Sequence, residues 1–516
     1  MGQGLKQFFT LFLFALGLHF SYAQKVEKIE LIDAEKLIGM VKDGEKAQKL
    51  VGKVRFRHKK AIMHCDSAYL YRDRNSMDAF GHIHINQGDT MNLYGDQLYY
   101  DGNEELATVT GDTVTLENKD FTLITDRIFY DRKNNIAQYK TGGLIESKND
   151  SNLLVSEIGY FYSDQSLFFF KDSVVLTNPD FVMRSDTLKY YSSTEMVNFL
   201  GPTIIEGDSN LIYCETGWYD TPKDQSRYYN NAYLISDGRK LEGDTLYYDR
   251  NLGYGQADGR VQITDTAENL MVNGKQAVMY EKKDSALVYG RPLLTQVFDS
   301  DSLFMHADTF KVFATDTLGR SLFAYYNVRI YKSDLQGQCD SIAYSLRDSI
   351  IQLRGEPILW SDKNQLTAEK IDIRTANNKI HSIFLDADAF IISEVDTVKY
   401  NQIKGREMTG YFKDGNLSLI HVRGNGQTTY WGQDDEDKFI GVNVAESSDI
   451  NIRLKEKSIN SISYLEQPNA TMHPMGELDP VKDLRYRGFK WLIELRPLSK
   501  KDIFETKVDE GLKTKD

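Results

Sequence analysis

An internal repeat of about 31 residues constrains this chain most, because each copy must fold against its neighbours. Its clearest copies are Leu93-Tyr-Gly-Asp96-Gln-Leu-Tyr-Tyr100 and Leu241-Glu-Gly-Asp244-Thr-Leu-Tyr-Tyr248. We call the central position of each copy the marker; it is an acid in eleven of the thirteen copies. The marker positions are Glu35, Asp66, Asp96, Asp126, Glu157, Asp186, Glu215, Asp244, Lys275, Asp308, Asp340, Glu369 and Arg406.

The residues around the marker predict a bent strand. The residue before it is always small, and the residue three before it is apolar in all copies but one, where Gly337 stands. Apolar residues often follow two and four positions after the marker, so the inward phase of the strand slips by one residue there. A bulge or sharp bend causes such a slip, and a small residue relieves crowding inside it. We therefore expect a structural role at the bend for Asp66, Asp96, Asp126, Asp186, Asp244, Asp308 and Asp340.

A second strand follows about fifteen residues later and opens on glycine, as in Gly81-His-Ile-His-Ile85 and Gly259-Arg-Val-Gln-Ile263. Turn residues such as Asp101-Gly-Asn103 separate the two strands. A length of 516 residues suggests three or four domains, whereas the repeat predicts one array over residues 24–465 and a tail over 466–516. The predicted fold is all-β, an elongated array of 26 to 28 V-shaped antiparallel strands with a short mixed C-terminal cap.

This repeat, small-acid-x-apolar-x-aromatic followed by Gly-x-Val/Pro-x-Ile, resembles the LptA/OstA family of lipopolysaccharide-transport proteins from about Ile29 to Tyr464. The chain looks most like the long OstA-like proteins of Bacteroidetes-type bacteria, with more repeats than the short bridge proteins and no C-terminal barrel. The resemblance implies a V-shaped β-jellyroll whose apolar trough shields acyl chains, without catalysis or cofactor, between the inner and outer membranes. The trough candidates are Leu93, Leu98, Leu123, Ile128, Met183, Leu188, Leu241 and Leu246.

The residues by themselves leave the interior open, because the same apolar positions can line a trough or pack into a closed core. A polysaccharide-binding or purely structural exported β-solenoid is therefore the alternative. In the transport interpretation, unpaired edge strands at the array ends would join jellyrolls of partner proteins by strand addition. Peripheral association with membrane complexes is compatible with this role.

The first 23 residues predict an export signal. Lys6 precedes an apolar run from Phe8 to Phe20, and Ser21-Tyr-Ala23 provides a cleavage site. We expect cleavage after Ala23 and a periplasmic protein, with association with the outer membrane compatible. The formal net charge of -13 argues against nucleic-acid binding, which needs clustered Lys and Arg.

No catalytic site is predicted. Acids that recur in nearly every copy do not make a single carboxylate pair, and all three cysteines stand at the small-residue position, which indicates structural thiols. The histidines offer one cluster, His58, His64, His82 and His84. His82 and His84 share a strand face as a zinc pair would, but a solvated face is the simpler interpretation, and we predict no metal.

The tail has a different pattern. Asp479-Pro480 predicts the start of a short helix that Gly488 ends. Phe489, Trp491, Ile493 and Leu495 then alternate with more polar residues, which predicts a strand or cap with an aromatic face. Such a segment would either cap the last repeat or dock onto a partner.

Overall fold

The computed structural model describes residues 27–88, 91–149, 151–236, 238–298, 301–315, 319–345, 347–376, 379–413, 416–434, 436, 438–455, 458–477 and 484–505. The predicted export signal, its cleavage site and residues 479–483 of the predicted helix at 479–488 lie outside them, and the described residues 484–488 are not helical. The chain divides into two compact units, Met1–Asp164 and Gln165–Asp516, which we call the N-terminal and C-terminal units. The predicted single array over residues 24–465 thus contains a unit boundary.

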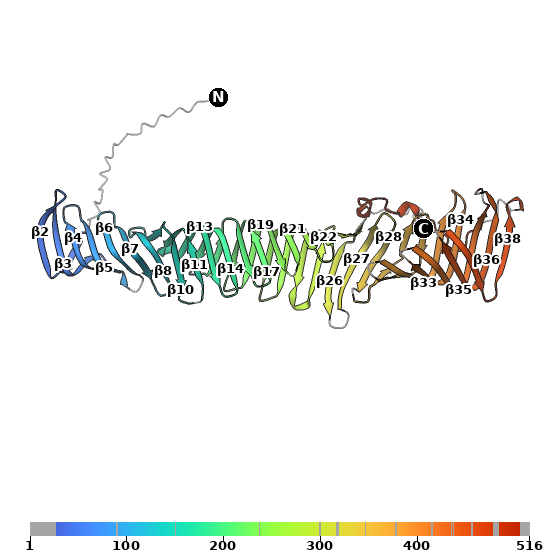
Figure 1. The fold of residues 1–516 in the computed structure, drawn as a ribbon, viewed down its shortest axis with the longest axis horizontal. Coiled ribbons are helices and arrows are strands. Elements are labelled where there is room, and N and C mark those ends of the chain that lie inside the picture. Colours follow the sequence, from blue (N-terminus) through green and yellow to red (C-terminus); the bar gives the residue numbers. More distant parts are fainter. Residues whose placement is uncertain are drawn as a thin grey trace, which may run out of the picture. The chain divides into compact units, whose positions relative to one another are not determined.

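Both units consist almost entirely of antiparallel strands (Figure 1). Those of the N-terminal unit are β1 Glu30–Asp33, β2 Lys36–Lys42, β3 Glu45–His58, β4 Ala61–Tyr71, β5 Ser76–Asn86, β6 Asn92–Asp101, β7 Leu106–Glu117, β8 Phe121–Asp131, β9 Ile136–Tyr139, β10 Gly143–Ser147, β11 Leu153–Ser156 and β12 Ile158–Tyr162. The first strands of the C-terminal unit are β13 Leu167–Asn178, β14 Phe181–Tyr191, β15 Met196–Phe199, β16 Thr203–Gly207, β17 Asn210–Cys214, β18 Thr216–Asp220, β19 Gln225–Ser236, β20 Arg239–Asp249, β21 Tyr254–Asp265, β22 Leu270–Tyr280, β23 Ser285–Tyr289, β24 Leu293–Val297 and β25 Ser302–His306.

The remaining strands are β26 Thr309–Thr315, β27 Gly319–Tyr331, β28 Gln336–Ser345, β29 Ile350–Arg354, β30 Ile358–Ser361, β31 Asn364–Thr367, β32 Lys370–Ala376, β33 Lys379–Glu394, β34 Tyr400–Lys413, β35 Asn416–Gln433, β36 Phe439–Lys455, β37 Ser458–Leu465 and β38 Asn469–Pro474. The described 3-10 turns are η2 Ser163–Gln165, η3 Glu281–Lys283, η4 Met475–Glu477, η5 Ile493–Leu495 and η6 Asp502–Phe504.

The number of bent strands agrees with the repeat. Ten pairs of successive strands, such as β9 with β10 and β17 with β18, are two arms of one strand interrupted by one to three residues at the bend. Counting each pair once reduces the 38 described strands to 28. This lies within the predicted range of 26 to 28, and the all-β repeat fold is confirmed.

The slip of the inward phase at the marker is confirmed in β4. Ala61, Met63 and Cys65 are buried before the marker acid Asp66, and Ala68 and Leu70 are buried after it. The inward positions therefore move by one residue at the small-acid pair, as the sequence predicts. The marker strand and its partner both change direction here.

The extra residue of the bend lies on the partner strand rather than at the small-acid pair. His64 pairs with His84 and Ser67 with Phe80, so two residues of β4 face three of β5. Gly81 and His82 have φ of +76° and +43°, the left-handed region. A Cβ at Gly81 would lie 2.4 Å from an Asp66 carboxylate oxygen, so both the backbone angle and the space require glycine. The glycine predicted to open the second strand of the repeat lies instead inside that strand, since β5 begins at Ser76, and it forms the corner of the V.

The bends divide each unit into two walls. Wall A contains the residue three before each marker, and wall B contains the residue two after it. Inward side chains of both walls form the buried interior, and outward side chains alternate with them. The interior between the walls is therefore the candidate binding site.

Candidate functional site: the apolar interior between the two walls

Wall A of the N-terminal unit contains a row of apolar inward side chains, one from each strand, that are directly paired from strand to strand. The row is Phe56, Met63, Ile85, Leu93, Leu116, Leu123, Ile145 and Leu154. Directly opposed side chains in a sheet lie close enough to touch, so the row is continuous. Because each copy of the repeat supplies the same position, the row extends through the unit.

The C-terminal unit has the same row on wall A. It runs through Leu176, Met183, Ile205, Ile212, Leu234, Leu241, Ile263, Val272, Leu294, Met305, Ile330, Gly337, Leu359, Leu366, Ile391 and Ile403. Gly337 is the one position without a side chain. The pattern of one apolar residue three before the marker thus becomes an almost unbroken apolar track.

Burial along this track differs between the units. Phe56, Leu93 and Leu116 of the N-terminal unit are at most 1% exposed, which describes a closed, packed interior. In the C-terminal unit five successive members of the row are only half-buried, namely Ile205, Ile212, Leu234, Leu241 and Ile263. The opposite wall remains buried there at Tyr228, Leu246 and Ala257. Strands β16–β21 therefore have an accessible apolar lining on wall A, which we call the open stretch.

The trough candidates all lie in the interior rows, in two different environments. Leu93, Leu98, Leu123 and Ile128 are fully buried in the N-terminal unit, and Met183, Leu188 and Leu246 are buried in the C-terminal unit. Leu241 is half-buried in the open stretch. Sequence reasoning did not name Ile205, Leu234 and Ile263 as trough residues. The last residue of the Gly-x-x-x-Ile signature was the available signal for Ile205 and Ile263, whereas Leu234 follows a corner made by Asn230 and Asn231 and lacks that signal.

The interior of the C-terminal unit narrows farther along the chain. An apolar cavity of about 30 Å³ lies between the walls at β31–β35. Leu366 and Ile391 line it from wall A, and Leu385, Met408 and Ile420 line it from wall B. This volume is about that of one water molecule in the liquid, so the side chains here nearly fill the V.

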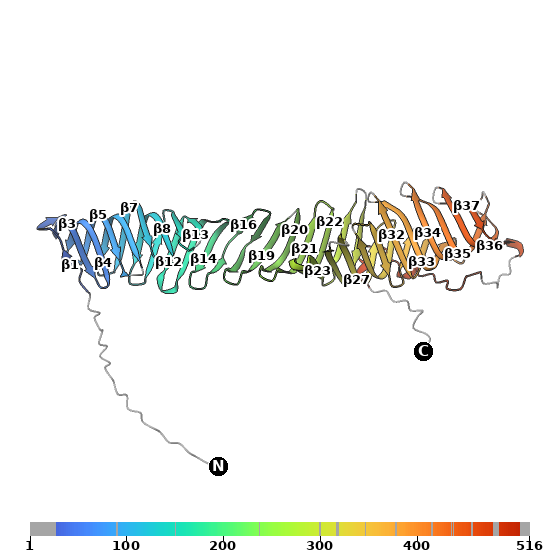
Figure 2. The same ribbon diagram turned by 90° about the horizontal axis from the view of Figure 1, so that it is seen from below.

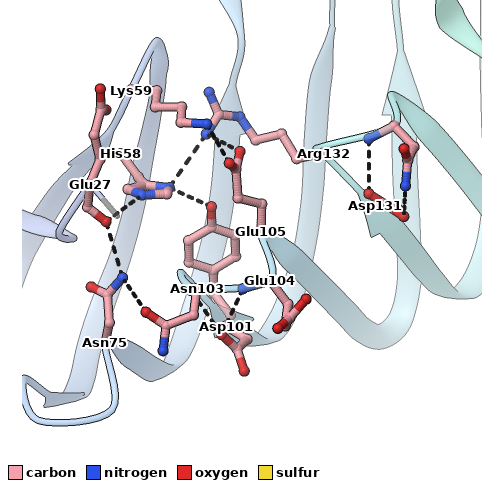
Figure 3. A network of polar contacts seen from close by, with 12 residues as sticks. Glu27, His58, Lys59, Asn75, Asp101, Asn103, Glu104, Glu105, Asp131 and Arg132 are labelled. Carbon is pink, nitrogen blue, oxygen red and sulfur yellow. Dashed lines mark hydrogen bonds and ion pairs between the residues drawn. The ribbon is translucent and has the colours of Figure 1, made fainter. Parts of the chain in front are cut away.

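Polar side chains close the mouth of the V in the N-terminal unit, as Figure 3 shows. His58 is the last inward residue of wall A in β3, and Tyr100 is the last inward residue of wall B in β6; both are 1% exposed. The Nδ1 atom of His58 lies 2.6 Å from the Tyr100 hydroxyl. Lys59 and Glu105, in turns on opposite walls, form an ion pair, and Arg132 lies 3.5 Å from Glu105. We call His58, Lys59, Tyr100, Glu105 and Arg132 the mouth cluster.

The chain entering β1 crosses this mouth. The Glu27 carbonyl accepts hydrogen bonds from His58 Nε2 at 3.1 Å and from the Asn75 amide at 3.1 Å. Asn75 also accepts a hydrogen bond from the Ile29 amide, and Ile29 is 3% exposed. Farther along, the Tyr130 hydroxyl donates to Gln87 on the other wall at 2.9 Å. The tyrosine four residues after the marker thus serves as the rim of the V, with its ring inside and its hydroxyl bonded across the mouth.

His58 is neutral in this arrangement. Because a carbonyl can only accept, Nε2 carries the hydrogen toward Glu27, and Nδ1 accepts from Tyr100. Burial lowers the pKa of His58 from its ordinary value, and the Arg132 guanidinium, 3.4 Å from Nδ1, lowers it further. Burial raises the pKa of Tyr100 to about 12, so this hydroxyl keeps its proton.

The marker acids lie outside the bends. Asp96 and Asp244 accept backbone hydrogen bonds from Asp112 and Arg260, the residues after the corner glycines. Asp66, Asp126 and Asp308 bond instead to the side chains of His82, Thr141 and Asn327. Asp186 and Asp340 bond to the hydroxyl of the next residue, and a Cβ on the facing glycine would lie 2.9 Å and 2.4 Å from their Cβ atoms. All seven acids therefore contact the bend, on the side away from the apolar interior.

The histidines singled out by the sequence separate into different environments. His82 contacts Asp66 at the bend, whereas His84 stacks on His64 and Tyr94 at ring distances of 5.7 Å and 4.5 Å. No group of three or more metal-ligating side chains occurs within the described ranges. Cys65, Cys214 and Cys339 are free and buried, and burial raises the pKa of each thiol to about 12. Such thiols are poor nucleophiles.

The described part of the tail, residues 484–505, is a strap on the outer face of wall A (Figure 2). Gln402 donates to the Leu484 carbonyl and accepts from the Tyr486 amide. Gln365 likewise donates to the Lys490 carbonyl and accepts from the Leu492 amide. Each glutamine, at most 2% exposed, thus holds the strap backbone at two points.

Apolar contacts complete the strap. Leu492 and Leu495 pack on Ile358 and Trp360, and Phe504 lies 4.6 Å from the His306 ring. Residues 489–495 form no strand, because the glutamine side chains, rather than a neighbouring strand, bond their backbone. The expected cap on the last repeat is not what residues 484–505 provide, since they contact strands between β25 and β35 of the same unit.

Residues 26–186 match the family described as OstA-like protein. Over residues 26–186 this match confirms the resemblance that the repeat indicates. The OstA-like stretch contains the mouth cluster and the first members of both apolar rows.

Comparison with solved structures finds LptH from Pseudomonas aeruginosa, described as the LptA-homologous periplasmic component of the conserved lipopolysaccharide transport device. Identity is 13%, the match covers 28% of this chain and 99% of that one, and the TM-score is 0.22. The search of curated proteins found no match. Across the described residues, no helix combines the length and apolarity that a membrane span requires.

Proposed function

We propose that this protein is a periplasmic, non-enzymatic carrier that shields the acyl chains of lipopolysaccharide or a related lipid between the inner and outer membranes. The observation that carries the proposal is the wall A row, which offers one apolar side chain per strand and becomes accessible in the open stretch. Exposing an acyl chain to water costs roughly 0.8 kcal/mol per CH₂, so a continuous apolar track lowers the cost of transfer. Repetition of the same side-chain type also avoids a deep energy well along the track.

The first strands offer an edge for a partner of the same architecture. In the described residues β2 pairs with β3 alone, and the inward residues Leu37 and Val41 are 50% and 66% exposed. A groove of about 500 Å³, lined in part by Met40 and Leu70, opens beside them. An edge strand of another jellyroll would pair with β2 and cover these side chains.

Site-specific photo-crosslinking in cells tests the proposal. Ile212 faces inward in the open stretch, and its neighbour Tyr213 faces outward against Tyr233, 5.1 Å between ring centres. A crosslinker at Ile212 or Leu241 should capture lipopolysaccharide, and one at Tyr213 should capture much less. Equal labelling at Ile212 and Tyr213 would refute the trough.

The alternative is an exported β-solenoid that binds polysaccharide or has a structural surface role. Outward aromatic residues such as Tyr247 and Tyr254, 6.3 Å apart, are the kind of surface that sugars can stack on. Binding of the purified chain to a polysaccharide array, with no lipid captured at Ile212, would favour that alternative.

A further inference from the structure

Two cations share one anion in the mouth cluster. The Glu105 carboxylate bonds to Lys59 and lies 3.5 Å from Arg132, and the side chains of Glu105 and Arg132 are only 13% and 9% exposed. The three side chains therefore sum to one positive charge in a mostly buried position. Burying a net positive charge raises the free energy of the folded state unless a further anion pairs with it.

Arg132 also has an unused donor. Its Nε atom is buried and has no hydrogen-bond partner among the residues that the structure describes. A guanidinium presents its donors as a planar fork that matches carboxylate or phosphate in a two-point contact. The Nη1 atom of Arg132 contacts Glu105 and His58, so the buried Nε atom is the donor of the fork that these contacts leave unfilled.

Glu105 is the last residue of the turn between β6 and β7, and its φ is +60°. The equivalent turn positions include Asn75, Asn135 and Glu195, with φ of +54°, +52° and +53°, so the left-handed backbone angle belongs to the turn and not to this glutamate alone. What distinguishes Glu105 is its side chain, which places an anion between Lys59 and Arg132.

We propose that Lys59 and Arg132 form a binding site for the phosphate of an anionic lipid headgroup, which Glu105 occupies as an internal anion until the lipid displaces it. This inference rests on the proposed function, because it places the headgroup at the mouth while the chains lie between the walls. A phosphate brings more acceptor oxygens than a carboxylate and can engage the Arg132 fork.

Displacement of Glu105 has a structural consequence. It breaks the Lys59–Glu105 pair that joins the two walls and draws Arg132 away from His58. The contacts of His58 with Tyr100 and Glu27 are the remaining closure at this point. Phosphate binding would thus loosen the mouth of the N-terminal unit and expose its packed interior to the acyl chains.

Calorimetry with two detergents of equal chain length tests the site on the full mature chain. Dodecyl phosphate should bind more tightly than dodecyl maltoside, which has an uncharged headgroup. Lys59→Met and Arg132→Gln should each weaken dodecyl phosphate binding by about tenfold or more and change dodecyl maltoside binding little. Glu105→Gln should strengthen dodecyl phosphate binding several-fold, because it removes the competing anion without removing a cation.

The outcomes separate this site from other interpretations. Lys59 is 40% exposed, so Lys59→Met should fold even if Arg132→Gln does not. Equal affinities for the two detergents, or equal responses to Lys59→Met and Glu105→Gln, would overturn the phosphate site. If Ile212 captures lipid in cells while both detergents bind alike, this site alone fails; if Ile212 captures none, the carrier function fails.

Discussion

At the scale of single residues, the corner glycines explain why each copy of the repeat combines a small residue, an acid and a glycine. The marker acid lies directly over the glycine of the next strand, so a Cβ at Gly259 would lie 2.2 Å from an Asp244 oxygen. The same acid accepts a hydrogen bond from the Arg260 amide. The small residue, the acid and the glycine thus form one bend, although they are distributed over two strands.

Gly259→Ala should destabilise the C-terminal unit by about 1–3 kcal/mol, because it combines a φ of +96° with that steric conflict. Gly238→Ala is the matched control, since Gly238 has a φ of +75° and nothing within 4 Å of the added Cβ. Denaturant unfolding measures both. An equal loss in the two variants would show that the backbone angle, and not the contact with Asp244, requires glycine.

The buried His58 makes the N-terminal unit sensitive to acid. Because its folded pKa is lowered from 6.5, the unfolded state binds the proton more readily, and stability falls as pH drops below about 6.5 toward the folded pKa. Above pH 7 the contribution of His58 to the free energy of unfolding should be constant. Hydrogen exchange at the Ile29 amide, which bonds to Asn75, should therefore accelerate at pH 5 beyond its intrinsic rate change.

The His58→Gln variant is the control for this effect, because glutamine can bond to Glu27 and does not titrate. Its Ile29 amide should show no excess acceleration between pH 7 and pH 5. His64, whose pKa burial also lowers, remains in that variant, so a persistent pH response would assign the effect to His64.

At the scale of elements, the strap shows a way of holding an extended segment without adding a strand. The strap crosses the strands instead of running beside one, so main-chain groups of the sheet are already paired and cannot bond it. Gln365 and Gln402 supply an amide that reproduces a peptide group on the outer face. The strap also covers Trp360, which is fully buried.

Gln365→Ala should loosen the strap by about 1–3 kcal/mol, because the Lys490 carbonyl and the Leu492 amide both lose their partner. Faster hydrogen exchange at Leu492 is the measurement. Gln296→Ala is the control. Gln296 also donates a hydrogen bond to a backbone carbonyl, but that carbonyl belongs to Glu268 and not to the strap. Similar exchange at Leu492 in both variants would argue against the glutamine clamp.

At the scale of the whole molecule, one repeat position has two environments. Leu93 and Leu241 both stand three residues before the marker, yet Leu93 is fully buried and Leu241 is half-buried. The same sequence pattern thus forms a closed core in the N-terminal unit and an accessible lining in the C-terminal unit. Under the proposed carrier function, the open stretch is where an acyl chain can lie without rearrangement of the protein.

Leu93→Glu should unfold the N-terminal unit or cost it more than about 3 kcal/mol, because it buries an unpaired charge. Leu241→Glu at the same repeat position should cost about 1 kcal/mol or less, because its carboxylate can reach water. Leu241→Glu should nevertheless reduce lipid capture at Ile212. Circular dichroism and the crosslinking assay measure the two effects, and equal destabilisation by both variants would contradict an open stretch.

Much of this architecture could be predicted from the sequence. The phase slip at Cys65-Asp66 and the inward row through Leu93 and Leu241 follow from local patterns, since bends and alternation are local properties of a strand. The corner at Gly81 was not predicted, because the extra residue lies on the partner strand and is found only once β4 and β5 are paired. The mouth cluster could not be predicted in this way, because His58, Tyr100 and Arg132 come from different copies of the repeat. The strap could not be predicted from the sequence either, because Gln402 and Gln365 lie 82 and 125 residues from the strap carbonyls to which they donate.

The sequence by itself determined the bent-strand repeat, its apolar phase and the small residue at each bend, because these depend on neighbours a few residues apart. The tertiary structure decided how deeply each inward side chain is buried, because burial depends on side chains that come from different copies and meet across the V, such as His58 with Tyr100 in the N-terminal unit. Leu93 and Leu241 hold the same repeat position, yet Leu93 is fully buried and Leu241 is half-buried.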